Sequence, residues 1–331
     1  LTPWRVHNSE GGGGQTSGHG GQIIVPLTER AQELGVQFVY NTSGKELITG
    51  SDGSVTGVKA ETADGTTITV NGKAVILATG GYASSEEMMA RFKDFLPSNK
   101  NTTVPAGNIG EGLIMAEAVG AKNFESDGLQ LVYVSYTCGV GINEESGLIV
   151  SAAGERVVNE WSYQSHVAAA LAEAKSPMGY YIATSNDPNP TVQYGITLDS
   201  TVKAATVEEL AGQLDMDPTV LKATVDRYNE LCAKGEDEDF GKPAEYMVPV
   251  EGDTYYAIAM NPGSSVTFGG LSINEESQVL DTEDKPIKGL YAAGEVAFTG
   301  LFGTEYPCCG MAIGSAVYFG RIAGTNAAGE Q

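Results

Sequence analysis

Two short apolar runs that each end in glycine constrain the fold of this chain more than any other feature. Residues 74–79 (Ala-Val-Ile-Leu-Ala-Thr) lead into Gly80 and Gly81, and residues 290–293 lead into Gly294. Runs without polar alternation are typical of strands buried on both faces, as in parallel sheets covered by helices. Ligands of such α/β folds bind where the strands end. The pattern therefore predicts an α/β fold with glycine turns at a ligand-binding edge.

Changes in residue composition and pattern divide the chain into an interrupted domain and an insertion. After the glycine-rich residues 11–21, the pattern predicts a helix with Ile23, Ile24, Leu27, Ala31 and Leu34 on one face. Strands are expected at 36–40 and 46–49, then a hairpin of 55–60 and 66–70. From about 126 to 266 tyrosine and acidic residues become more frequent, and strand-and-glycine texture returns afterwards with a helix at 311–325. We expect an α/β domain of 1–125 and 267–331 around an inserted domain of 126–266.

The charge of the chain restricts its partners. It has 19 Lys and Arg against 42 Asp and Glu, a formal net charge of −23, which repels nucleic acid and anionic lipid surfaces. Its apolar runs fall far short of the roughly 20 residues that a membrane span needs. Its 4 Cys residues have no C-x-x-C spacing and it has 3 His residues, so we expect no metal site made by this chain alone. The acidic run 236–239 predicts a solvated loop.

Three elements together predict a dinucleotide cofactor, although each alone is an ordinary turn. Two are the glycine turns after the apolar runs, and the second of these carries Glu295, a carboxylate that can accept hydrogen bonds from a bound polyol. The third is 306–314 (YPCCGMAIG), which opens an apolar helix. The amino end of a helix favours an electron-rich ligand.

The order of several motifs resembles one family. The motifs are VILATGG at 75–81, GNIGEGLIMAEAVGA at 107–121, GERVVNE at 154–160, GEDEDFGKP at 235–243, GGL at 269–271, GLYAAGEV at 289–296 and GSAVYFGRIAG at 314–324. They resemble the FAD-dependent fumarate reductase and 3-ketosteroid dehydrogenase flavoproteins along essentially the whole chain. The resemblance implies a bacterial FAD enzyme with a Rossmann-like FAD-binding domain at 1–125 and 267–331, interrupted by an α+β substrate-capping domain at 126–266.

The opening segment of that family has no counterpart in this sequence. The family begins with a strand, a G-x-G-x-x-G turn and a helix that hold the cofactor pyrophosphate. Residues 11–21 are rich in glycine but lack a preceding apolar strand. We therefore expect a fragment, a processed form or half of a split flavoprotein, with a separate N-terminal fragment as one candidate partner.

The resemblance implies cofactor roles for individual residues. Gly44 would face adenine through its backbone, and Glu295 with Gly294 would hold the ribityl hydroxyls. The diphosphate and ribityl region would be lined by Thr79, Gly80 and Gly81. The family's Gly-Asp-Gly turn falls at Gly110, Glu111 and Gly112. The helix that opens with Gly310, Ala312 and Ile313 would point toward the pyrimidine end of the isoalloxazine.

In this family flavin N5 exchanges hydride with a carbon next to a carbonyl or carboxylate, and a protein group handles the proton. Arg156 matches the arginine that fumarate reductases use as that acid, and the alternative is a structural pair with Glu160 or another acid. The fumarate reductase histidines are replaced by residues near 132–134 and 265–266, and the carboxylate-clamping arginine falls at Pro307. A dianionic substrate needs such charge-assisted bonds, so these replacements disfavour fumarate.

Tyrosines at the replaced positions resemble the ketosteroid dehydrogenase branch. Tyr306 and Gly310 match a turn whose hydroxyl and amide polarise a ketone oxygen, and Tyr163 matches the capping-domain tyrosine that handles the proton. For each tyrosine the alternative is core packing. Two donors at a developing enolate and a phenol for the proton suit a neutral enone.

We predict an FAD-dependent oxidoreductase that transfers hydride between flavin N5 and the C=C or CH–CH bond of a neutral, enone or ketosteroid-like small molecule. Its electrons would pass through a donor protein or domain of unknown identity. One alternative is a fumarate reductase-like reductase of unsaturated organic acids that uses Arg156. A second is a non-catalytic flavoprotein fragment or assembly subunit that no longer binds FAD tightly.

Overall fold

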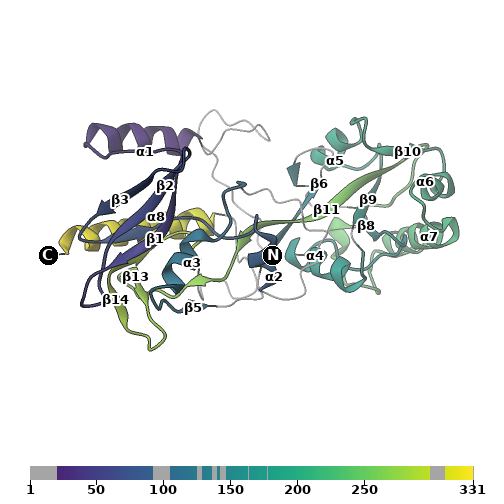
Figure 1. The fold of residues 1–331 in the computed structure, drawn as a ribbon. Coiled ribbons are helices and arrows are strands. Elements are labelled where there is room, and N and C mark those ends of the chain that lie inside the picture. Colours follow the sequence, from purple (N-terminus) through teal and green to yellow (C-terminus); the bar gives the residue numbers. More distant parts are fainter. Residues whose placement is uncertain are drawn as a thin grey trace. The chain divides into compact units, whose positions relative to one another are not determined.

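The computed structural model describes residues 21–91, 105–124, 129–135, 140–141, 147–162, 164–176, 178–298 and 310–330. The chain forms two compact units, coloured along the sequence in Figure 1. The first unit comprises Leu1–Phe92, Ala106–Gly128 and Thr267–Gln331, and the inserted unit comprises Lys93–Pro105 and Leu129–Val266. Among the residues described, no helix is long and apolar enough to cross a membrane.

A three-stranded sheet in the first unit contains both apolar runs. Its order is β13 (Gln278–Leu280), β14 (Pro286–Ala292) and β4 (Val75–Leu77). β14 is antiparallel to β13 and parallel to β4, with Tyr291 opposite Ile76. The two glycine turns therefore follow strands that end at the same edge of the sheet, as the sequence predicts. Helix α8 (Met311–Gly329) packs on this sheet through Ala323, which contacts Tyr291 and Ala293.

A second sheet of the first unit is an antiparallel meander of β1 (Thr42–Thr49), β2 (Val55–Thr62) and β3 (Thr67–Asn71). The predicted hairpin is confirmed, and its turn holds Gly65 at φ +84°. Helix α3 (Glu111–Glu117) packs against β1. This unit also contains α2 (Glu86–Ala90), β5 (Asn123–Phe124) and β12 (Gly270–Leu271).

Helix α1 (Gly21–Glu33) forms where the sequence predicts it, but its apolar face is open. Ile24 and Leu27 are each 60% exposed and Leu34 is 67% exposed. The strand predicted at 36–40 is wrong, because these residues belong to no strand and Tyr40 is 67% exposed. A strand requires a neighbour that pairs with its backbone groups, and none of the described residues supplies one here. The apolar pattern of residues 36–40 is not sufficient to form a strand without such a neighbour.

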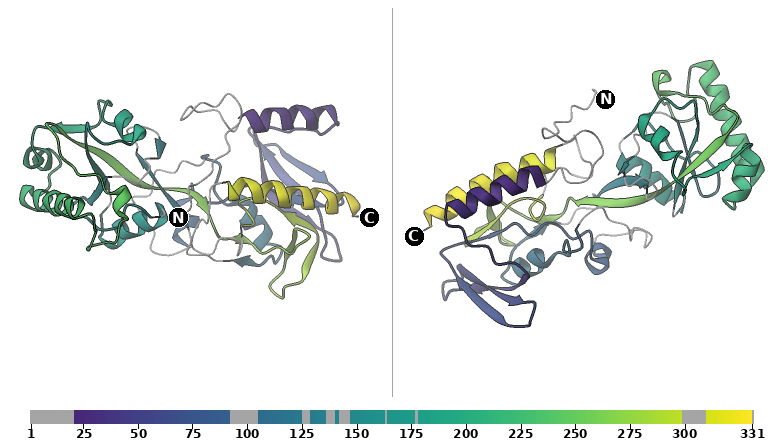
Figure 2. Two further views of the ribbon diagram at one scale, coloured as in Figure 1. Left: turned by 180° about the vertical axis from the view of Figure 1, so that it is seen from behind. Right: turned by 90° about the horizontal axis from the view of Figure 1, so that it is seen from above.

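Helix α8 is also incompletely covered. Ala323 is its one buried residue, while Met311, Ile313, Val317 and Tyr318 are exposed. The two helices overlap when seen from above (Figure 2, right), but the front view shows that α1 and α8 are separated (Figure 1). The first unit thus carries two apolar helix faces that its own described residues do not bury.

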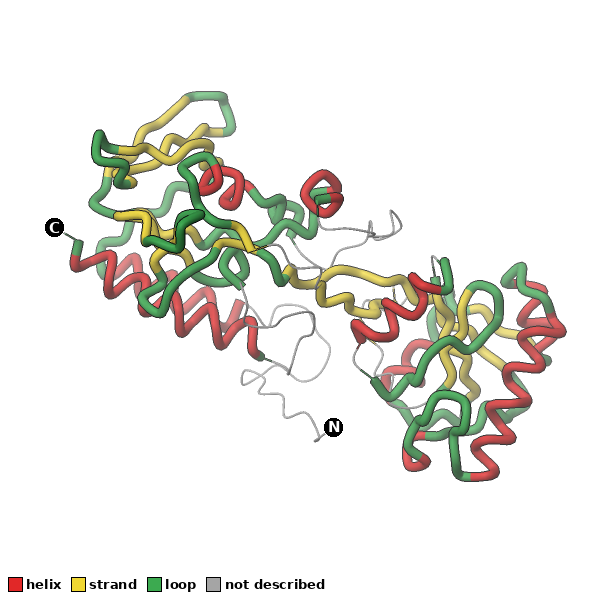
Figure 3. Tube along the Cα trace, turned by 90° about the horizontal axis from the view of Figure 1, so that it is seen from below, coloured by secondary structure: helices red, strands yellow, loops and turns green. Residues whose placement is uncertain are grey.

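The inserted unit is a sheet covered by helices, whose alternation of helix and strand is marked in Figure 3. The strand order is β7 (Val140–Gly141), β6 (Leu129–Ser135), β11 (Tyr255–Thr267), β9 (Gly179–Thr184) and β8 (Leu148–Ser151), and β10 (Val202–Ala204) pairs with β11. The helices are α4 (Gln164–Glu173), α5 (Pro190–Gly195), α6 (Val207–Gln213), α7 (Pro218–Lys234) and the 3-10 turn Ala244–Tyr246. Leu148 and Val150 pack with α6 and α7, whereas Ile149 between them packs with α4. Alternate residues point to opposite faces of a strand, so helices cover both faces.

Helix α7 begins and ends at the predicted residues. The Asp217 carboxylate accepts a hydrogen bond from the Thr219 N–H at 2.8 Å, and Pro218 occupies the first turn. Gly235 closes the helix at φ +73°, a left-handed conformation that glycine adopts without strain. Its predicted apolar face is confirmed, because Leu221, Val225, Tyr228 and Leu231 are all buried.

Candidate functional site

The carboxylate of Glu295 lies at the centre of the glycine turns of the first unit. Its Oε1 accepts hydrogen bonds from the Thr267 N–H at 2.8 Å and from the Thr267 hydroxyl at 3.0 Å. Its Oε2 accepts a hydrogen bond from Asn108 Nδ2 at 3.3 Å. Thr267 and Asn108 are both buried. We call Gly80, Gly81, Asn108, Thr267 and Glu295 the glutamate cradle.

Glycine is required at both backbone positions of the glutamate cradle. A Cβ on Gly81 would lie 2.3 Å from Glu295 Oε1 and 2.1 Å from Thr267 Oγ1. Gly80 has φ +74°, and a Cβ there would lie 2.2 Å from Asn108 Oδ1. The absence of side chains lets this backbone pass directly against the carboxylate and its supports.

Helix α3 brings further predicted cofactor residues to the same place. Gly110, at φ +82°, precedes the helix and donates its N–H to the Gly81 carbonyl at 3.1 Å. A Cβ on Gly112 would lie 2.0 Å from Thr79 Oγ1, so the two residues are in contact. The Glu111 carboxylate accepts a hydrogen bond at 2.9 Å from Ser43, the neighbour of Gly44 on β1. Residues far apart in sequence thus converge as expected.

The start of α8 lies beside the second glycine turn. A Cβ on Gly294 would be 3.7 Å from Ala316 Cβ, which places the second turn of α8 against this residue. Gly310 precedes the helix at φ +86° and no side chain caps it. Ala312 and Ile313 occupy the first turn, and Ile313 is exposed. Tyr163 and Tyr306 lie outside the described residues.

Arg156 lies in the inserted unit and is held by two carboxylates. Its Nε and Nη2 donate to Glu160 at 2.9 and 2.7 Å, and its Nη1 and Nη2 donate to Asp237 at 2.9 and 2.8 Å. The rings of Tyr228 and Phe240 each lie 4.9 Å from the guanidinium carbon. Burial disfavours the charge, but the bonds to Glu160 and Asp237 outweigh it and raise the pKa of Arg156. The structural pair with Glu160, the alternative to a catalytic role for Arg156, is present, and a guanidinium so engaged is poorly suited to give up a proton.

Two residues that the sequence interpretation missed complete this buried ion cluster. Asp237 is 5% exposed, so the expected solvated loop is wrong at this position. Its burial acts to raise its pKa, but the bonds from Arg156 and the Lys242 N–H lower it overall. The Lys242 ammonium donates to the Gly147 carbonyl at 2.7 Å, and burial lowers its pKa. The composition of 236–239 gave no signal for this, because a partner distant in sequence decides which acid is buried.

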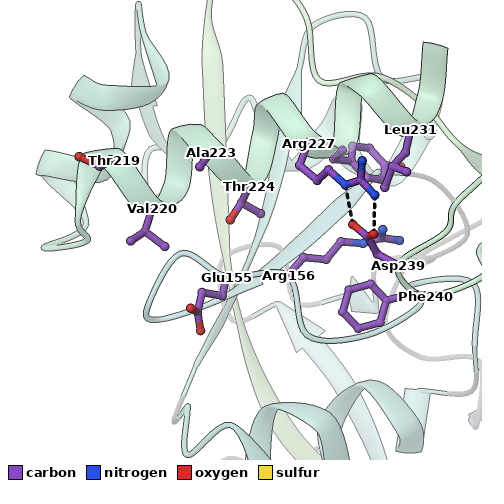
Figure 4. A pocket seen from close by; sticks show the side chains of 11 residues that line it. Glu155, Arg156, Thr219, Val220, Ala223, Thr224, Arg227, Leu231, Asp239 and Phe240 are labelled. Carbon is purple, nitrogen blue, oxygen red and sulfur yellow. Dashed lines mark hydrogen bonds and ion pairs between the residues drawn. The ribbon is translucent and has the colours of Figure 1, made fainter. Parts of the chain in front are cut away.

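A pocket of about 680 Å³ lies on α7 in the inserted unit (Figure 4). The side chains of Arg227 and Asp239 meet in it at 2.7 Å, as the dashed lines show. The other lining residues are Glu155, Arg156, Thr219, Val220, Ala223, Thr224, Tyr228, Leu231 and Phe240. The pocket contains no residue of the glutamate cradle, and two of its charged groups already neutralise each other.

Comparison with known proteins identifies the family. Residues 1–313 match the family described as FAD binding domain. The chain belongs to the FAD binding domain family. FAD is accordingly its cofactor, and the expected FAD-binding fold is confirmed.

Individual relatives of this FAD-binding chain come from both predicted branches. Urocanate reductase of Eggerthella lenta is 32% identical, over 93% of this chain and 54% of its own length. The open structure of a flavocytochrome c3 fumarate reductase is 32% identical with a TM-score of 0.79, covering 98% of this chain and 58% of that one. The 3-ketosteroid delta1-dehydrogenase of Sterolibacterium denitrificans, in complex with 1,4-androstadiene-3,17-dione, is 25% identical with a TM-score of 0.77, covering 92% and 62%. The FAD-binding chain therefore spans little more than half the length of these proteins.

The glutamate cradle fits the cofactor of this family. A carboxylate accepts hydrogen bonds from hydroxyl groups such as those of the ribityl chain. Glycines at Gly80 and Gly81 leave the backbone uncovered for close approach of a ligand, and the amino end of α8 suits an electron-rich ring. Asn108 and Thr267 are additional to the predicted set. Asn108 lies within the motif 107–121, but only the fold shows that it reaches Glu295.

We predict that Arg156→Met destabilises the inserted unit. The change removes the cation that Glu160 and Asp237 share and leaves Lys242 beside Glu160, and breaking such a buried pair costs about 3–5 kcal/mol of unfolding free energy. Urea denaturation measures this, and Arg227→Met, which removes an exposed guanidinium of the same face, should cost far less. A variant that keeps the wild-type unfolding free energy but loses all turnover would instead show Arg156 to be the catalytic acid.

Proposed function

We propose that this chain is the catalytic part of an oxidoreductase that forms or reduces a C=C bond next to the carbonyl of a neutral, enone or ketosteroid-like substrate. The observation that carries the proposal is the glutamate cradle, in which Gly81 passes against Glu295 with no room for a side chain. FAD, when bound there, supplies hydride transfer. Both a ketosteroid dehydrogenase and reductases of unsaturated acids are among the similar proteins.

The residues of the chain would divide the work. Glu295 would bind ribityl hydroxyls, and the amino end of α8 would stabilise negative charge near the ring. Tyr306 and the Gly310 N–H would donate hydrogen bonds to the substrate carbonyl oxygen, where charge develops. Tyr163 would exchange the proton on the neighbouring carbon through its phenol group.

A reductase of unsaturated organic acids is the second candidate, and the urocanate and fumarate reductase relatives favour it. In that function Arg156 would give the proton. Its four hydrogen bonds to Glu160 and Asp237 oppose this role, because each donated N–H is already committed to a carboxylate. The enone hypothesis assigns the proton to Tyr163, so the hydrogen bonds of Arg156 can stay intact.

The two candidates differ in the substrate that reoxidises the reduced protein. With dithionite-reduced protein, we expect a 3-keto-4-ene or similar cyclic enone to restore the oxidised flavin spectrum faster than fumarate or urocanate. Tyr306→Phe should slow the enone reaction by about 10²-fold or more, because one donor to the developing enolate is lost. Faster reaction with an unsaturated acid, unchanged in Tyr306→Phe, would contradict the proposal.

We also propose that the working protein includes a further polypeptide segment and a separate electron donor. The support for the segment lies on the first unit. Among the described strands, β4 pairs with β14 alone, and the Leu77 carbonyl faces β14 because it accepts from the Ala293 N–H. The N–H and C=O groups of successive residues point to alternate sides of a strand. Those of Ile76 therefore point away from β14, toward the edge of β4 that no described strand pairs with. The exposed apolar residues of α1 and α8 would gain cover from the same segment.

Hydrogen exchange on the native material tests this segment. When a co-purifying polypeptide is retained, we expect the amides of Ile76 and of the first turns of α8 to be protected. When it is removed, the amide of Ile76 should exchange faster, because a free edge amide faces water. Equal protection in both preparations would contradict a segment docked at β4.

A further inference from the structure

We infer that Asn108 is a positioning residue, which fixes the Glu295 carboxylate so that one of its oxygen atoms is presented to a hydroxyl group of the bound cofactor. The inference rests on the proposed function, because it assigns a partner to the same carboxylate. It adds a residue to which the sequence resemblance gives no role.

The geometry leaves one direction open at Glu295. A carboxylate has about four acceptor sites. Thr267 uses two of them on Oε1 through its N–H and its hydroxyl, and Asn108 uses one on Oε2. The hydrogen bonds between described residues thus leave one site, on Oε2. Since an ionised carboxylate only accepts hydrogen bonds, a ligand at that site must be a donor, and a neutral hydroxyl meets this need without adding charge.

Asn108 is itself held in place. It is 6% exposed, and its backbone carbonyl accepts the N–H of Ser84 at 2.9 Å. Its Oδ1 packs against the Cα side of Gly80, where a Cβ would collide with it at 2.2 Å. Because the Glu295 carboxylate only accepts hydrogen bonds, the amide presents Nδ2 to it. Thr267, the other support, is the residue at which the chain re-enters the first unit.

Asn108→Asp is the sharpest test because it keeps the size and shape of the side chain but replaces the amide donor by a carboxylate. The variant puts a second carboxylate 3.3 Å from Oε2 in place of the donor. Two such groups repel when both are ionised and can share a proton when one is not. The FAD dissociation constant, measured from pH 5 to pH 8 on the protein as isolated, should rise about tenfold or more at pH 8. The increase should shrink as the pH falls, whereas the wild type should show no such recovery.

Two further variants separate positioning from general damage. Asn326→Asp makes the same change in the same unit, where the amide donates to the Glu276 carbonyl, and should leave FAD affinity unchanged. Thr267→Val removes one donor but keeps the N–H, so it should weaken FAD binding less and without the recovery at low pH. If Asn108→Asp binds FAD with wild-type affinity, or if its loss of affinity does not depend on pH, the inference about Asn108 is wrong and the proposed function still stands. A wild-type protein that binds no FAD overturns the proposed function together with it.

Discussion

The close approach of the Gly80–Gly81 backbone to the Glu295 carboxylate is the constraint on which the rest of this site depends. It exists because β4 and β14 are parallel, so that their glycine turns emerge at one edge. The supports of the carboxylate come from segments distant in sequence, at Asn108 and Thr267. The Glu295 carboxylate is half-buried and accepts three hydrogen bonds from Thr267 and Asn108, which fix it without supplying a cation to neutralise it. The arrangement therefore points to a ligand rather than to stability.

The inserted unit uses buried charge differently. Arg156 and Lys242 face Glu160 and Asp237, so two cations and two anions neutralise one another beneath α7. The cluster ties the strand β8 to the loop after α7, because Glu160 also accepts the Ile149 N–H at 3.2 Å. Such a closed set of ion pairs has little capacity left for a substrate. In this structure Arg156 and Glu160 of the motif at 154–160 therefore bond to each other and to neighbours within the inserted unit.

The sequence could predict the features that depend on residues close together in the chain, and it missed those that depend on distant partners. The strands predicted at 74–79 and 290–293, which correspond to β4 and the end of β14, and the caps of α7 depend on local patterns, so they were predictable. The strand expected at 36–40 depends on a neighbour that the described residues do not provide, so periodicity misled. Asp237 and Asn108 were missed for the opposite reason: each acts through a partner more than 80 positions away. Acidic composition or a motif letter does not reveal such a partner.

The central claim is that the glutamate cradle holds FAD, and the flavin content of purified Gly81→Ala tests it most directly. The added methyl group would lie 2.3 Å from Glu295 Oε1 and must displace the carboxylate. Gly107→Ala is the matched control, since its methyl group would meet no atom within 4 Å. The account predicts a folded Gly81→Ala protein without flavin and a Gly107→Ala protein as yellow as the wild type. Full flavin occupancy and wild-type affinity in Gly81→Ala would contradict it.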